Sequence, residues 1–350
     1  MIASAAETAF NAAITERILV KDGPYGTAVQ ALGLVEADYR GTLSVNLDQK
    51  GNNDVLNITR PEAIAGIARS YIDAGADILA TNTFNANSIS QADYGLEHLV
   101  GDINRAAASI LRTEADAAEA RDGRRRYVVG ALGPTNKTLS LSPKVEDPGY
   151  REVDFDGVKA VYREQIDALL EGGVDFILIE TVFDTLNAKA AAFAAMDAEE
   201  ALGRRVPIML SMTLTDLAGR NLSGQTVEAF WTSIAHVKPL TVGLNCSFGA
   251  TELRPHVQTL AAKVDSPIMV YPNAGLPNDM GAYDELPETT GGFIRDWAEQ
   301  GLINAVGGCC GTTPAHIAAM AKAVSDLPPR PIPTLVPALR LSGLEAAVFA

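Results

Sequence analysis

The sequence predicts an α/β fold, a (β/α)8 TIM barrel with long loops over the C-terminal face. Eight short apolar runs alternate with helical patterns of about 10 to 17 residues, which is typical of βα units and a parallel sheet. Eight units favour a closed barrel over an open, doubly wound sheet. No Gly-x-Gly-x-x-Gly follows the first apolar run, so a dinucleotide-binding fold lacks its main support.

The first half of the chain repeats a helix followed by a strand. A helix over 60–73 is expected because Thr59, Arg60 and Pro61 form a start signal, and a helix over 158–171 because it closes with Gly172 and Gly173. The spacing predicts helices at 3–17, 60–73, 103–120 and 158–171. The strands that follow them are predicted at 18–20, 78–80, 127–132 and 176–179.

The second half continues the same alternation. Strands are predicted at 207–212, 241–244, 268–271 and 303–306, each after a helix, at 186–202, 227–236, 251–262 and 289–300. A final helix over 314–324 is expected, because Thr313 can cap it and Pro314 suits the first helical position.

Each predicted strand ends in polar residues or glycine, while the strand starts carry no candidate functional residues. A barrel gathers all its strand ends on one face. The residues expected to converge there are Asp22, Thr81, Glu180, Cys246, Asn273, Cys309 and Cys310. Residues 39–57 and 134–157 show no clear periodicity and are expected to form long loops over the same mouth.

Composition limits the classes of function. The 350 residues carry 28 Lys and Arg against 43 Asp and Glu, a net charge of −15, which argues against binding nucleic acid or an anionic membrane. No apolar run approaches the roughly 20 residues of a membrane span. The N-terminus contains Glu7 and lacks a basic region, so no signal peptide is expected. Three cysteines without export signals fit a reducing compartment, and we expect a cytoplasmic protein.

The three cysteines are the main chemical candidates. Cys309 and Cys310 lie among glycines between a strand and a helix start, and Cys246 follows a strand in the same way. Three thiolates converging at a barrel mouth would form a soft metal site, for which zinc is the usual occupant. Three protein ligands would leave a fourth position for substrate. The alternative is that the cysteines are small buried hydrophobic residues.

The other polar residues at the strand ends each allow two interpretations. Glu180 follows four apolar residues, so it should pair with an arginine or bind a cationic ligand. Asp22 and Gly23 form either a turn or part of a binding site, and Asn273 is either a simple loop cap or a further residue of that site. The four histidines lie on or beside predicted helices and are poor ligand candidates.

The C-terminal segment differs from the rest. Five prolines occur between Pro328 and Pro337, followed by an apolar stretch at 339–349. We therefore expect residues 1–327 to form the barrel with its N-terminal lead-in helix, and residues 328–350 to form a proline-rich strap or linker without a further domain.

Several motifs together resemble the homocysteine S-methyltransferase family over about residues 16–345. They are ILVKDGPYGT at 18–27, TNTF at 81–84, GPTN at 133–136, IETVFDTL at 179–186, GLNCS at 243–247 and GGCCGTTP at 307–314. The GPTN, ETVFDTLNAKAA and KGNND stretches look most like the homocysteine-binding module of cobalamin-dependent methionine synthase. Three residues depart from the family pattern. Pro24 and Tyr25 stand where the family more often has a small residue followed by Met, and Ala80 stands where an acidic residue is common.

The resemblance implies a function and a set of site residues. Cys246, Cys309 and Cys310 match the zinc ligands, and Asn273 matches the residue that fills the fourth position when substrate is absent. Asp22, Gly23, Thr81 and Glu180 match the pocket for the amino and carboxylate groups of homocysteine. The implied reaction is zinc-dependent methyl transfer to the homocysteine thiol, giving methionine. Methylcobalamin would be the methyl donor. The resemblance implies that the cobalamin-binding and folate-binding modules belong to a separate module or chain, because this chain stops where the full synthase continues.

Two other functions are compatible with the same residues. One is a stand-alone enzyme that uses betaine or S-methylmethionine, which additional aromatic residues around a methylated cation would favour. The other is a subunit that binds zinc or homocysteine without catalysis. The overall aromatic content of 6% does not favour the first of these.

Overall fold

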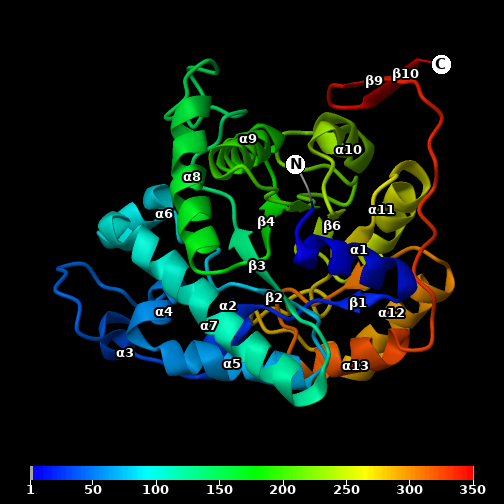
Figure 1. The fold of residues 1–350 in the computed structure, drawn as a ribbon. Coiled ribbons are helices and arrows are strands. Elements are labelled where there is room, and N and C mark those ends of the chain that lie inside the picture. The colour runs from blue at the N-terminus through cyan, green and yellow to red at the C-terminus, as the bar shows by residue number, and fades with distance from the viewer. Residues whose placement is uncertain (1–2, 350) are drawn as a thin grey trace.

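An eight-stranded parallel sheet forms the centre of the computed structural model, which describes residues 3–349 (Figure 1). Its neighbours follow the order β1-β8-β7-β6-β5-β4-β3-β2. The strands are β1 (Leu19–Val20), β2 (Ile78–Ala80), β3 (Tyr127–Leu132), β4 (Phe176–Val182), β5 (Ile208–Met212), β6 (Thr241–Asn245), β7 (Ile268–Tyr271) and β8 (Ala305–Val306). The predicted fold, a (β/α)8 barrel, is confirmed.

The barrel closes between its first two strands, β1 and β2. A parallel bridge joins Lys21 to Ile78, the Asp77 N–H donates to the Val20 carbonyl at 2.6 Å, and the Asp22 N–H donates to the Ile78 carbonyl at 2.9 Å. Two carboxylates extend this short ladder. Asp77 accepts from the Val20 N–H and Asp22 accepts from the Ala80 N–H, both at 2.9 Å.

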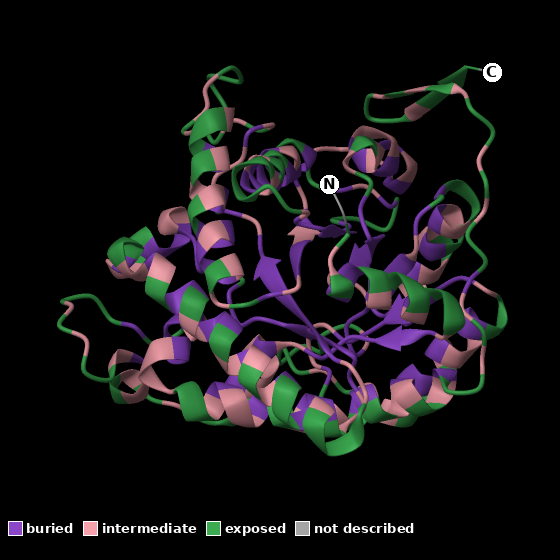
Figure 2. Ribbon diagram, viewed as in Figure 1, coloured by how far each residue is buried: buried purple, intermediate pink, exposed green. Residues whose placement is uncertain are grey.

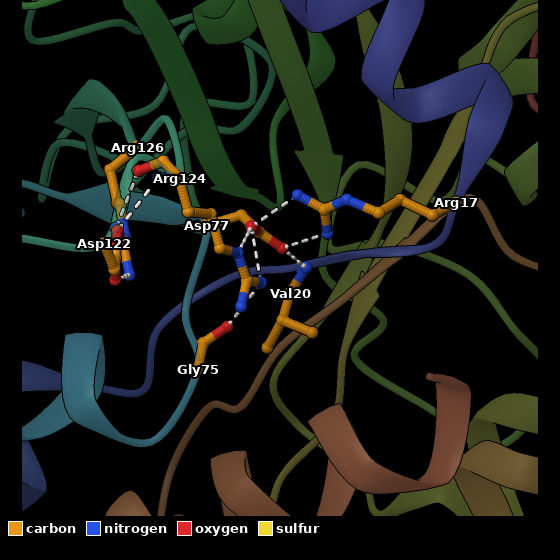
Figure 3. Close-up of polar contacts among 7 residues, drawn as sticks. All are labelled: Arg17, Val20, Gly75, Asp77, Asp122, Arg124 and Arg126. Carbon is orange, nitrogen blue, oxygen red and sulfur yellow. Dashed lines mark hydrogen bonds and ion pairs between the residues drawn. The ribbon is translucent and has the colours of Figure 1, made fainter. Parts of the chain in front are cut away.

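Two arginines donate hydrogen bonds to Asp77 at the seam, the junction of β1 and β2 where the barrel closes (Figure 3). Arg17, from the end of the first helix, donates to both carboxylate oxygens at 2.7 and 2.8 Å, and the Nε of Arg124 donates at 2.8 Å. The Asp77 side chain is fully buried. Since a buried carboxylate needs several partners to offset its lost hydration, this network stabilises the seam.

The helices surround the sheet, with their exposed faces outward (Figure 2). The long helices that follow strands are α5 (Pro61–Asp73), α7 (Val100–Asp122), α8 (Phe155–Glu171), α9 (Thr185–Leu202), α10 (Val227–Ile234), α11 (Ala250–Lys263), α12 (Pro287–Glu299) and α13 (Pro314–Val324). All eight lie within a few residues of the predicted helices. Shorter α-helices are α2 (Tyr25–Ala31), α3 (Glu36–Arg40), α4 (Leu56–Thr59) and α6 (Ser88–Gln91). Among residues 3–349, no helix is long and apolar enough to cross a bilayer.

Alternate strand residues divide the core into two layers. Along β3, for example, Tyr127, Val129 and Ala131 belong to the inner cluster within the barrel, and Val128 and Leu132 to the outer cluster beneath the helices. This is the period-two alternation of a strand with both faces buried. The same alternation directs polar residues at the C-terminal strand ends into the barrel mouth.

The lead-in helix α1 (Ala5–Glu16) covers the opposite end of the barrel. Its Phe10 is fully buried and makes edge-to-face contacts with Tyr127 and Phe176, the first residues of β3 and β4. Aromatic side chains therefore fill the N-terminal end of the barrel.

The proline-rich segment at 328–338 contains no helix or strand. It leads to an antiparallel hairpin of β9 (Leu339–Ser342) and β10 (Ala346–Phe349), which lies against α10. The Thr226 N–H donates to the Leu344 carbonyl, and the Ser342 hydroxyl donates to the Ala229 carbonyl. The hairpin was not predicted as secondary structure, only as an apolar segment.

Candidate active site

A cavity of about 260 Å³ opens at the C-terminal ends of the strands. Six of the eight predicted site residues line it: Gly23, Thr81, Glu180, Cys246, Cys309 and Cys310. Asp22 and Asn273 lie behind this wall and are 1% and 2% exposed. From the long loop predicted at 39–57, Asn53 and Asp54 reach the same cavity. The first residues of the 134–157 loop line a neighbouring cavity instead.

The three cysteine sulfurs lie together on one side of this cavity. All three Sγ atoms are within 4.8 Å of one another, and those of Cys246 and Cys310 are 3.6 Å apart. Thiolates bound to one tetrahedral zinc ion at about 2.3 Å would be about 3.8 Å apart. The donor set, its spacing and its partial burial therefore fit a soft metal ion such as zinc.

Backbone hydrogen bonds fix the Cys309-Cys310 pair. The Cys309 N–H donates to the Pro272 carbonyl at 2.8 Å, and the Ala274 N–H donates to the Cys310 carbonyl at 2.9 Å. Gly311 follows with φ of 79°, and a Cβ there would lie 2.3 Å from the Tyr283 ring. Glycine is required at this position on both grounds.

Asn273 lies between these two backbone contacts. Its N–H donates to the Phe248 carbonyl, but its side-chain Oδ1 is buried with no hydrogen-bond partner among the described residues. A buried side-chain oxygen without a partner is uncommon in a native fold, and this one lies on the chain segment whose backbone contacts Cys309 and Cys310.

Strained backbone surrounds the cluster. Cys246 and Ser247 have φ of 62° and Thr181 has φ of 57°, values that are rare for residues with side chains and cluster at functional sites. Asn245 holds two of these segments together. Its Oδ1 accepts from the Thr181 N–H at 3.1 Å, and its Nδ2 donates to the Thr181 hydroxyl at 2.8 Å. The position of Thr181 is thereby tied to that of Cys246.

Glu180 projects into the mouth through an irregularity in β4. The pairing register between β4 and β5 shifts between Ile179 and Val182, and bulges of this kind often redirect a side chain near an active site. Burial raises the pKa of the Glu180 carboxyl, while the nearby charge of Lys21 opposes that effect. Glu180 is thus a partly buried acid facing a cavity, as its position after four apolar residues suggested.

Lys21 and Asp22 form a buried ion pair beside Glu180. The Lys21 Nζ lies 2.8 Å from Asp22 Oδ1, and both side chains are at most 5% exposed. Lys21 lines the cavity, whereas Asp22 does not. Burial alone would lower the pKa of Lys21, but the charges of Asp22 and Glu180 raise it above its usual value. The Lys21 Nζ is thus one half of a salt bridge within the protein.

Asp54 is a buried acid for which no role was predicted. It is 3% exposed, lines the cavity, and accepts from the Asn85 N–H at 2.9 Å through Oδ1. Burial raises its pKa to about 7. Its place in the KGNND stretch was the available signal, whereas nothing in the sequence spacing set Lys21 apart from other strand residues.

The three thiols share protons unevenly among themselves. Hydrogen bonds from Cys246 and Cys309 lower the pKa of Cys310 to about 3, and the contact with Cys246 raises the pKa of Cys309 well above its ordinary value. A bound cation would instead favour thiolates at all three positions, with release of the remaining protons.

The fold and the site define a class of protein, a (β/α)8 barrel with a three-thiol metal-type cluster at its catalytic mouth. The chain belongs to the homocysteine S-methyltransferase family, whose model matches residues 19–324. The expected resemblance is confirmed, and with it methyl transfer to homocysteine as the reaction of the family.

Solved structures of a homocysteine methyltransferase from Escherichia coli, MmuM, share the fold. The metallated form is 24% identical with a TM-score of 0.68, over 88% of this chain and 96% of that chain. The oxidized form is 22% identical with a TM-score of 0.68, over 87% and 95% of the two chains. The apo form is 22% identical with a TM-score of 0.62, over 88% and 96%.

Proposed function

We propose that this chain transfers a methyl group to the thiol of homocysteine, which binds at a zinc ion held by Cys246, Cys309 and Cys310. The observation that carries the proposal is the cluster of three Sγ atoms within 4.8 Å in the barrel mouth. Asn273 would supply the fourth ligand in the absence of substrate, through its unpartnered Oδ1. Bound zinc would supply a substrate thiolate at neutral pH that three protein thiolates keep electron-rich.

The reaction balances as a single group transfer. The thiol proton is released when homocysteine binds. The sulfur then forms a bond to the methyl carbon, and the bond from that carbon to the donor breaks with its electron pair left on the donor. The protein's task is to hold the sulfur at the cysteine cluster and to orient the rest of the amino acid toward the opposite wall.

The amino-acid end of homocysteine would bind the wall that carries Gly23, Thr81 and Glu180. Glu180 is the acid of this wall and would receive the ammonium group. The backbone at Gly23 would approach the carboxylate, and a side chain is excluded there because a Cβ would lie 2.7 Å from the Tyr71 ring. Asp22 would act from behind the wall, through its pairing with Lys21.

Methylcobalamin is the proposed donor, and we propose that a separate module or chain binds the cobalamin and the folate. The support is the resemblance of the GPTN, ETVFDTLNAKAA and KGNND stretches to the methionine synthase module. We further propose residues 1–327 as the catalytic barrel and 328–350 as a strap. A cytoplasmic location is proposed because the three cysteines are free thiols.

One observation favours a second candidate, a stand-alone enzyme that uses betaine or S-methylmethionine. Three aromatic residues, Tyr25, Phe84 and Tyr271, line the cavity, and aromatic rings can bind methylated cations. Tyr271 already has the Lys21 ammonium 4.8 Å from its ring centroid, which leaves two rings for such a donor.

A donor panel tests these proposals. The purified, zinc-loaded chain is given homocysteine with methylcobalamin, betaine or S-methylmethionine, and methionine is measured. Methionine formed from methylcobalamin alone supports the first proposal, and methionine from either other donor supports the second. Zinc bound without methionine from any donor would instead indicate a subunit that binds without catalysis.

A further inference from the structure

Lys21 is an unusual member of the cavity wall. Among the described residues that line the cavity, it is the only one with a cationic side chain. It follows β1 at a position that points into the barrel, and it is 4% exposed. A lysine is rarely buried to this extent unless it is paired, so its charge has a specific place in the site.

Neighbouring groups fix the Lys21 side chain on three sides. Gly307 directly follows the adjacent strand β8, and a Cβ on it would lie 2.7 Å from the Lys21 Cβ, so the absence of a side chain there makes room for the lysine. The ammonium lies 4.8 Å from the centroid of the Tyr271 ring and 2.8 Å from Asp22 Oδ1. The cation is therefore pre-positioned before any substrate binds.

Both carboxylate oxygens of Asp22 are engaged by protein partners. Its Oδ1 accepts from Lys21 and its Oδ2 accepts from the Ala80 N–H. Ala80, where the family commonly has an acidic residue, adds no charge. The cavity wall then offers one cation, at Lys21, and two carboxyl groups, at Glu180 and Asp54. Neither carboxyl pairs with a cation within 4.0 Å among residues 3–349. Glu180 lies on β4 of the sheet that Lys21 follows, whereas Asp54 lies on the 39–57 loop and accepts from the Asn85 N–H.

We propose that Lys21 determines specificity by binding the α-carboxylate of the substrate, while Glu180 binds its ammonium group. This inference rests on the proposed function and extends it, because it selects thiols that carry a carboxylate. A cation and an anion on the same wall complement an amino-acid zwitterion, and an ammonium held by Asp22 and Tyr271 keeps donors free for a further acceptor.

Three thiols separate the roles of the two charges. Homocysteine carries both groups, 4-mercaptobutanoate lacks the ammonium group, and 3-aminopropane-1-thiol lacks the carboxylate. Binding of each to the zinc-loaded full chain is measured by calorimetry for the unmodified protein and for Lys21→Met. The matched control is Lys263→Met, which removes a lysine from the outer face of α11, 3.4 Å from Glu228.

Lys21→Met is expected to weaken binding of homocysteine and 4-mercaptobutanoate by about tenfold or more, the usual effect of losing a hydrogen bond to a charged group. Binding of 3-aminopropane-1-thiol should change by less than about twofold, and Lys263→Met should change none of the three. Equal loss for all three thiols, or no loss for homocysteine, would overturn the proposal.

The double variant Lys21→Met/Asp22→Asn shows whether an unpaired Asp22 causes the effect. The introduced amide oxygen would keep an acceptor for the Ala80 N–H, and the substitution removes the charge left behind by the lysine. If homocysteine and 4-mercaptobutanoate still bind weakly to the double variant, the proposal is supported. Recovery of homocysteine affinity overturns it. If the unmodified protein fails to bind homocysteine at all, the proposed function fails, independently of Lys21.

Discussion

The Sγ atoms of Cys246 and Cys310 lie 3.6 Å apart, although 64 residues separate them in the chain. The sheet order explains this proximity. Cys246 follows β6 and Cys310 follows β8, and β7 lies between these strands. The chain that leaves β7 contains Asn273, so three consecutive strand ends supply the sulfurs and the unpartnered oxygen. Parallel pairing in register is what converts distant residues into one potential ligand set.

Cys309→Ala should abolish both zinc binding and methyl transfer. Removal of one of three thiolates leaves too few ligands for tight tetrahedral binding. We expect zinc, measured by mass spectrometry after dialysis, to fall from about one equivalent to well below half an equivalent. Ser247→Ala alters the neighbour of Cys246, whose hydroxyl contacts Thr213, and should retain its zinc. One full equivalent in Cys309→Ala would refute the three-cysteine assignment.

Glu180→Gln should weaken homocysteine binding without loss of zinc. The substitution keeps the shape of the side chain and removes the charge that would pair with the substrate ammonium. We expect KM to rise by roughly 10- to 100-fold, corresponding to about 1.5–3 kcal/mol for a charged hydrogen bond. Binding of 4-mercaptobutanoate, which has no ammonium group, should be unaffected or improved. A KM within twofold of the unmodified value would contradict this role.

Much of this architecture was predictable because it depends on local patterns. Short continuous apolar runs, and helices with start signals at Pro61 and Pro314, specify βα units, and eight such units specify a barrel. The convergence of the three cysteines followed from their places after β6 and β8, while their positions alone also allowed them to be small buried packing residues. The pattern directly determines these features, since every strand end of a barrel meets the others.

The remaining site features depend on tertiary contacts that the sequence does not encode locally. Asp22 was expected in the cavity, but its pairing with Lys21 and with the Ala80 N–H draws it behind the wall. Lys21 directly follows an apolar strand, and nothing in its sequence position distinguished it from a core residue. Asp54 lies in a loop without periodicity, and its burial depends on contacts with residues near Asn85.

Asp77→Ala should destabilise the barrel at the seam between β1 and β2. The variant leaves the Val20 N–H without its side-chain acceptor and separates Arg17 and Arg124 from their shared carboxylate. Loss of a buried, paired carboxylate costs about 3–5 kcal/mol, and partial exposure of both arginines places this variant toward the lower end. The measurement is the free energy of unfolding in urea. Asp73→Ala, which removes the exposed partner of Arg121, should cost less than about 1 kcal/mol.

Asp54→Asn should change how stability depends on pH. Because burial raises the pKa of Asp54 to about 7, the unfolded chain loses this proton at lower pH than the folded chain. The free energy of unfolding therefore falls as pH rises from about 4 to about 7, by at most about 4 kcal/mol, and then levels off. The asparagine side chain would keep the acceptor for the Asn85 N–H but cannot ionise.

The variant should accordingly be more stable than the unmodified protein at pH 8, by roughly 1–3 kcal/mol, and similar to it at pH 4. Urea unfolding at both values measures the difference. Asp48→Asn alters a loop carboxyl that is 92% exposed and serves as the control, with the same pH dependence as the unmodified protein. If Asp54→Asn gave an equal change in stability at both values, the ionisation of Asp54 would not be the cause, since only a titrating group links the two measurements to pH.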